Sequence, residues 1–247
     1  MFIPLLLIFQ DAPAAAQKEP PRFAQCMDLA TTDPKAGQED AVKWRSEGGG
    51  ALARQCLGVA YANAGRWESA AGAFEDAARE AENAKDARAP NYWAQAGNAW
   101  IAAGDPAKAR ADIDAALAAG TLTGLALGEA HLDRARALVG AGDLEGARGD
   151  IDRALLYADN DPLAWLLSAT LARRAGDLPR AAKDIAEALR RSADDASVQL
   201  EAGNIAVASG NEADARTAWN RAIELAPGSP VAANARKALE QFGATEH

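Results

Sequence analysis

The chain has 247 residues, of which 49% are hydrophobic and 25% charged, and its net charge is −9. This acidic balance argues against nucleic acid as a partner, because phosphate binding needs clustered lysine and arginine. A closed structural zinc site needs four Cys or His ligands and would have to use both cysteines and both histidines of the chain, including the last residue, His247, which argues against such a site. The 65 alanines and the scarcity of β-branched runs favour helices and argue against an all-β fold.

Residues 1–16 have the layout of a secretory signal peptide. An apolar run over Met1–Phe9 precedes the small residues Ala14–Ala16, which suggests cleavage before Gln17. No lysine or arginine precedes the apolar run, and a disordered apolar N-terminus on a cytoplasmic protein is the alternative. The run is shorter than the roughly 20 residues of a transmembrane helix, and no second run is long enough to span a bilayer. We therefore expect a periplasmic or otherwise exported protein without a transmembrane segment in the mature chain.

Residues 17–50 are expected to form a linker and a divergent N-terminal cap. Pro20 and Pro21 mark a short spacer, and helices are predicted over 22–30 and 36–47 with a break at Asp33-Pro34. Three glycines at 48–50 then separate this helical pair from the next segment.

A repeated pattern organises the rest of the chain. An alanine lies five residues after each of five glycines, a large apolar residue follows four residues later, and another alanine three after that. The 4 and 3 steps place these residues on one helical face. The glycine suits the left-handed residue that ends a first helix, and an Asp or Asn after it can cap a second one. The five glycines are Gly65, Gly104, Gly142, Gly176 and Gly210.

This pattern resembles the tetratricopeptide repeat family, whose motif places small residues, glycine, alanine and bulky residues at these offsets. Trp93 and Trp165 match the family's tryptophan position, and Pro227 matches its proline. The resemblance implies an all-α, right-handed superhelical solenoid of about five helix-turn-helix repeats. These are 51–84, 90–123, 128–161, 162–195 and 196–229, with a C-terminal cap helix and tail at 230–247. The insertions 85–89 and 124–127 are expected to form longer helices or loops with wider bends.

The two cysteines are expected to form a disulfide. Cys26 lies on the first helix of the cap and Cys56 on the first helix of repeat one. First helices of successive hairpins are neighbours in such a stack, and an exported protein favours the bonded pair. Two buried thiols are the alternative.

The resemblance also implies a concave groove, lined by the first helices, that binds a protein or peptide segment. Asparagines in it would bond a peptide backbone, and arginines would pair with carboxylates. As alternatives, the asparagines are ordinary repeat features and the Arg173-Arg174 pair is solvated or complements its helix end. The candidate groove residues are Asn98, Ile101, Leu132, Arg136, Arg173, Arg174, Asn204 and Val207.

Other conspicuous residues are expected to be structural. Five tryptophans (Trp67, Trp93, Trp100, Trp165 and Trp219) are predicted to pack in the core or between repeats. His131 is predicted to be partly buried. The carboxylates Asp112, Asp114, Asp150, Asp152 and Asp184 are predicted on a solvated outer face, since residues two apart do not share a helix face.

No phosphate loop, HExxH or CxxC motif occurs in the sequence, and we predict no catalytic residue, metal or cofactor. The sequence thus predicts a non-enzymatic scaffold or adaptor that acts in the bacterial envelope through its groove. A structural subunit of an envelope assembly, packing through its outer face or with itself, is the alternative. The partner's identity is open.

Overall fold

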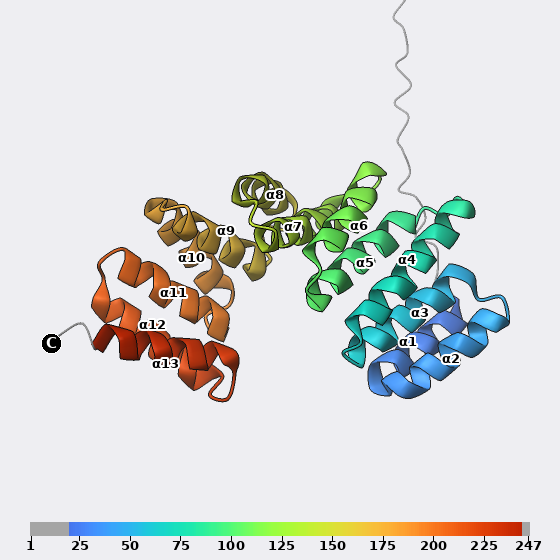
Figure 1. Ribbon diagram of the computed structural model, residues 1–247, viewed down its shortest axis with the longest axis horizontal. Coiled ribbons are helices and arrows are strands. Elements are labelled where there is room, and N and C mark those ends of the chain that lie inside the picture. Colours follow the sequence, from blue (N-terminus) through green and yellow to red (C-terminus); the bar gives the residue numbers. More distant parts are fainter. Residues whose placement is uncertain (1–19, 244–247) are drawn as a thin grey trace, which may run out of the picture.

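The computed structural model describes residues 20–243, and every regular element in that range is an α-helix (Figure 1). Residues 1–16, expected as a signal peptide, and the last four residues lie outside it. The helices are α1 Pro21–Thr32, α2 Pro34–Ser46, α3 Gly50–Asn63, α4 Trp67–Asn83, α5 Ala89–Ala103, α6 Pro106–Ala118, α7 Gly124–Gly140, α8 Leu144–Tyr157, α9 Pro162–Arg174, α10 Leu178–Arg191, α11 Ala196–Ala208, α12 Glu212–Leu225 and α13 Pro230–Gly243.

Successive helices pack as hairpins that follow one another along an arch (Figure 1). The odd-numbered helices begin the hairpins and are called first helices; the even-numbered ones are called second helices. Helix α13 packs against α11 and α12 and covers the C-terminal end of the stack. None of the helices in residues 20–243 is both long and apolar enough to cross a bilayer. The expected all-α repeat solenoid is confirmed.

The five repeated glycines form the turns that were predicted for them. Their φ angles lie between +71° and +83°, the left-handed region in which a side chain is strained. After four of them an Asp or Asn caps the second helix; Asp143, for example, accepts a hydrogen bond from the Gly146 amide at 2.9 Å. Arg66 replaces the cap in the first repeat and makes no such bond.

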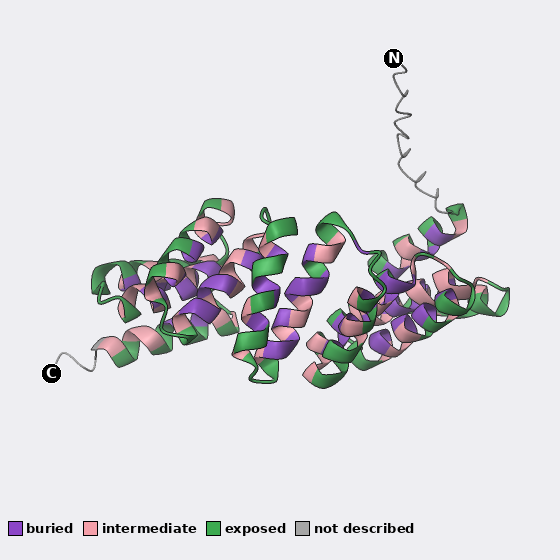
Figure 2. Ribbon diagram, turned by 90° about the horizontal axis from the view of Figure 1, so that it is seen from above, coloured by how far each residue is buried: buried purple, intermediate pink, exposed green. Residues whose placement is uncertain are grey.

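The small residues of the first helices let the second helices approach closely. A Cβ atom added at Gly97 would lie 2.4 Å from Cγ1 of Ile113, and one added at Gly203 would lie 2.4 Å from the Trp219 ring. Each large residue fills the space left by a missing side chain, which explains the small–large pairing in the sequence. Buried residues consequently follow the faces where helices meet (Figure 2).

Four of the five tryptophans agree with their expected packing. Trp100 and Trp219 are buried, and Trp93 and Trp165 are half-buried. Trp67 is a correction: it is the first residue of α4, and its side chain is exposed, whereas Ala70 and Ala71 of the same helix are buried.

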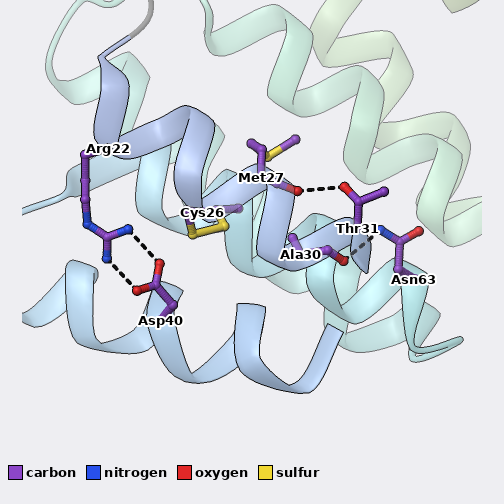
Figure 3. Close-up of a disulfide and its surroundings, with 8 residues drawn as sticks. Arg22, Cys26, Met27, Ala30, Thr31, Asp40 and Asn63 are labelled. Atoms are coloured by element: carbon purple, nitrogen blue, oxygen red, sulfur yellow. Dashed lines mark hydrogen bonds and ion pairs between the residues drawn. A yellow bond between two sulfur atoms is a disulfide. The ribbon is translucent and has the colours of Figure 1, made fainter. Parts of the chain in front are cut away.

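A disulfide joins the N-terminal hairpin to the next one. Cys26 on α1 and Cys56 on α3 are bonded, with their Cα atoms 6.1 Å apart (Figure 3). Both residues are fully buried between helices that pack against each other. Nearby, the Asn63 amide donates to the Ala30 carbonyl at 3.0 Å, a second tie between α1 and α3 (Figure 3).

The two insertions take different forms. Residues 85–88 form a turn before α5, and the Gln55 amide of α3 donates to Gln95 of α5 at 3.3 Å across this point of the stack. Residues 124–127 instead form an additional first turn of α7. Helices α5 and α7 pack together despite this insertion.

Candidate functional site

The first helices lie on the inner side of the curve. Helix α5 packs against α7 and α9 against α11, whereas no two second helices are among the packed pairs of the described chain. A stack in which one row of helices approaches more closely curves toward that row. We call the surface of α3, α5, α7, α9 and α11 on this side the inner wall.

Polar side chains connect neighbouring first helices along the inner wall. Asn98 on α5 donates to Asp133 on α7 at 2.9 Å, and Arg136 donates to the other oxygen of Asp133 at 2.8 Å. Between α9 and α11, Arg173 donates to the buried Glu201 at 2.6 Å. These contacts fix the spacing of the helices and place amide and guanidinium groups at the surface.

Arg174 is the most accessible of the three predicted arginines. It is exposed at the end of α9 and has no ion pair within residues 20–243. Arg136 and Arg173 are half-buried and already hold carboxylates. A carboxylate of a partner would therefore meet Arg174 without displacing an internal acid.

The remaining predicted residues differ in availability. Asn98 is exposed, and Ile101 and Val207 are half-buried on the inner wall. Both polar groups of the Asn204 side chain already have partners. Its NH2 group donates to Glu201, and its oxygen accepts from the Trp219 indole at 3.1 Å.

Leu132 is a correction to the predicted groove. It is buried against Ala154 of α8 and Ala164 of α9, so it is closed to a partner. The first turn of α9 covers the position that would otherwise face the groove.

Two carboxylates expected on the outer face are buried. Asp150 accepts two hydrogen bonds from Arg134 at 2.7 Å and one from the ring of His131 at 2.9 Å. Burial alone would raise the pKa of Asp150, but the bonds from Arg134 and His131 outweigh it and hold the pKa below its usual range. Asp184 is likewise buried and accepts from Ser168 and Arg180.

These buried groups hold helices together. Arg134 also donates to Asp114 of α6 at 2.8 Å, so it links the α5–α6 hairpin to the α7–α8 hairpin. His131 is buried, in line with its predicted packing role. The sequence indicates this cluster only indirectly. A repeat that carries His131 or Arg134 on its first helix and Asp150 on its second helix can pair these residues where the two helices meet.

A family profile described as tetratricopeptide repeat matches residues 132–196 and 166–230. No curated protein sequence is significantly similar to the chain.

Several solved structures share the fold at low sequence identity. PilW, described as a widely conserved type IV pilus biogenesis factor, is 20% identical with a TM-score of 0.70, over 87% of this chain and 98% of its own. PilF of Pseudomonas aeruginosa is 14% identical with a TM-score of 0.68, over 91% and 97%. YrrB, described as having an unusual peptide-binding site, is 19% identical with a TM-score of 0.56, over 79% and 96%.

Proposed function

Since the chain belongs to the tetratricopeptide repeat family, we propose that it is a non-enzymatic scaffold or adaptor that binds a protein segment on its inner wall. The observation that carries this proposal is the combination of polar and apolar groups that α5, α9 and α11 present on the inner wall. Arg174 offers a guanidinium group, Asn98 an amide, and Ile101 and Val207 apolar surface. The peptide-binding site in the description of YrrB supports the same use of the fold.

The proposed segment carries at least one carboxylate. Arg174 is the accessible cation of the inner wall, and a guanidinium group matches carboxylate geometry. A segment in an extended or helical form would cross several first helices and place apolar side chains near Ile101 or Val207. This arrangement needs no change in the buried Arg173–Glu201 pair.

A pull-down from envelope extract tests the role of the inner wall. Arg174→Glu reverses the charge and is expected to weaken recovery of a specific partner roughly fivefold or more. Lys183→Glu is the matched control, because it makes the same charge change on the exposed face of α10. Arg173→Glu is unsuitable, since it would leave Glu201 facing another carboxylate. Equal recovery of every protein by wild type and Arg174→Glu would remove the basis of the proposal.

We further propose that the protein acts in the bacterial envelope. The apolar run and small residues within 1–16 support export, and a disulfide is typical of an oxidising compartment. PilW, which shares the fold, is described as a type IV pilus biogenesis factor, and this description supports an envelope setting.

Cell fractionation tests the location. The full chain is expected in the periplasmic fraction, and a chain that begins at Gln17 is expected to stay in the cytoplasm. If the two chains distribute identically, residues 1–16 do not act as a signal peptide.

A further inference from the structure

Exposed large apolar side chains gather at one edge of the molecule. Six such side chains are exposed within residues 20–243, and four of them lie where α7 begins, α8 ends and α9 begins. Single exposed apolar residues are ordinary, whereas a cluster marks an interaction site. These helices lie at the middle of the arch (Figure 1). We call this cluster the apolar edge, and it consists of Leu125, Leu156, Tyr157 and Leu163.

The residues of the apolar edge lie on segments that approach one another closely. A Cβ atom added at Gly128 of α7 would lie 3.1 Å from Cβ of Tyr157. Leu125 precedes Gly128 by three residues, a spacing of about 5–6 Å between Cβ atoms on a helix. On the other side, the Asp161 amide donates to the Ala158 carbonyl at 3.1 Å, and Asp161 accepts from the Leu163 amide at 2.9 Å.

One member of the edge, Leu125, comes from a departure of the chain from its 34-residue period. Helix α7 has 17 residues, whereas the first helices α9 and α11 have 13 each. The additional turn is the insertion 124–127, and it carries Leu125, which is 58% exposed. Ala126 and Leu127 of this turn pack against the core, whereas Leu125 points away from it and adds apolar surface.

The earlier insertion borders a cleft one repeat away. The turn that contains Lys85 borders a cleft of about 310 Å³, whose lining also includes Pro90, Trp93 and Thr121. Thr121 lies four residues before Leu125, in the connection between α6 and α7.

The charge around the apolar edge is mainly negative. Glu129 lies one turn after Leu125, and burial, followed by the charges of Asp133 and Asp161, raises its pKa. Asp159 is exposed in the connection to α9. Arg153, one turn before Tyr157, is the nearby cation of α8, and it lies 3.9 Å from the buried Asp150. A partner that brings positive charge relieves the repulsion among these acids.

We propose that the apolar edge, together with Glu129 and Asp161, docks a partner-protein segment that carries aliphatic or aromatic side chains flanked by lysine or arginine. A second copy of this chain is a poorer occupant. Each copy has a net charge of −9, and a symmetric contact would place the acids of one edge against those of the other. The inner-wall proposal concerns an acidic segment and a different surface.

The test is a selection of displayed random 12-residue peptides on the full chain. The selected peptides are expected to combine apolar residues with lysine or arginine. They should bind Leu125→Ser with Leu156→Ser at least tenfold more weakly, and Glu129→Lys more weakly as well. Val42→Ser is the control, because Val42 is an exposed apolar residue on α2, far from the edge along the chain. Circular dichroism verifies that each variant is folded.

Other results would overturn the proposal. Selection of acidic peptides, of no peptides, or of peptides that bind the double serine variant as well as wild type would exclude docking at this edge. Peptides lost with Arg174→Glu but retained by the double variant would belong to the inner wall. Sedimentation of a wild-type dimer that the double variant abolishes would assign the edge to self-association instead.

Discussion

Arg173 on α9 donates from Nε to Oε1 of Glu201 on α11 at 2.6 Å, and this pair joins two neighbouring first helices. The Glu201 side chain is only 9% exposed, and its Oε2 accepts from Nη2 of Arg173 at 3.3 Å and from the Asn204 amide at 3.1 Å. A buried carboxylate that loses its cation is strongly destabilising, because its desolvation is no longer offset. Arg173 therefore stabilises the packing of α9 against α11 and is less available to bind a partner on the inner wall.

Replacement of Arg173 by methionine is expected to lower the free energy of unfolding by roughly 2–3 kcal/mol, somewhat below a fully buried pair because Arg173 is partly exposed. Changing Glu201 to leucine in the same chain should recover much of that loss. Arg174→Met is the matched control and should stay within about 0.5 kcal/mol of wild type. Urea unfolding at neutral pH measures all three, and equal stability of Arg173→Met and Arg174→Met would contradict the assignment.

The disulfide is expected to stabilise the N-terminal hairpin against unfolding. Cys26 and Cys56 are 30 residues apart, and closing such a loop contributes roughly 3–4 kcal/mol by chain entropy. Cys26→Ala with Cys56→Ala should lower stability by about that amount, and added reductant should then have no further effect. Wild type should lose the same stability only when reductant is present. Two reactive thiols in unfolded, non-reduced wild type would show that the bond does not form.

Asp150 and Asp114 offer a matched comparison, because both accept from Arg134 but only Asp150 is buried. Asp150→Asn is expected to cost about 2–3 kcal/mol at pH 7, whereas Asp114→Asn should cost about 0.5 kcal/mol or less. The pKa of Asp150 is lowered in the folded protein, so its contribution is present above the unfolded pKa of about 3.9 and disappears as pH falls through the folded value. The difference between the two variants should therefore shrink below pH 4. A difference that persists unchanged at pH 3 would contradict this sign.

Features set by local spacing could be predicted from the sequence. A glycine followed by Asp or Asn, as in Gly142-Asp143, specifies a left-handed residue and a cap within a few residues of chain. The contact between Cys26 and Cys56 could be predicted as well, because the first helices of stacked hairpins are neighbours. Both inferences depend on short-range geometry that is repeated along the chain.

Features that depend on how one hairpin packs against the next could not be predicted from the sequence. Leu132 occupies a groove position by spacing, but Ala164 of the next hairpin covers it. Asp150 precedes the core residue Ile151, so whether it reaches water depends on the facing helix; here Arg134 and His131 cover it. Spacing along a helix fixes its faces, whereas the neighbouring helices decide which faces remain exposed.

Asp112 should give the protein a stability that falls as pH rises toward neutrality. Burial, and then the charge of Glu75, raise the pKa of Asp112 to about 7, and one of its carboxylate oxygens is buried without a hydrogen-bond partner. Arg79 of α4 opposes this shift, and the nearby Trp100 indole donates to Glu75 at 2.8 Å. Between pH 4 and 7 the folded chain therefore binds a proton that the unfolded chain has lost, so stability decreases with pH across that window.

Asp112→Asn removes this titration and should stabilise the protein above pH 7. With allowance for solvent screening the gain is about 1 kcal/mol, or roughly 2–4 °C in Tm. Near pH 4, where Asp112 is protonated in the folded chain, the variant and wild type should melt together. Asp114→Asn, two residues away and more exposed, is the control and should show no such pH-dependent gain. Circular dichroism measures the Tm of each protein between pH 4 and 8. If the Tm difference between Asp112→Asn and wild type instead grew toward pH 4, Asp112 would be ionised in the folded protein and stabilised there, which would contradict the prediction.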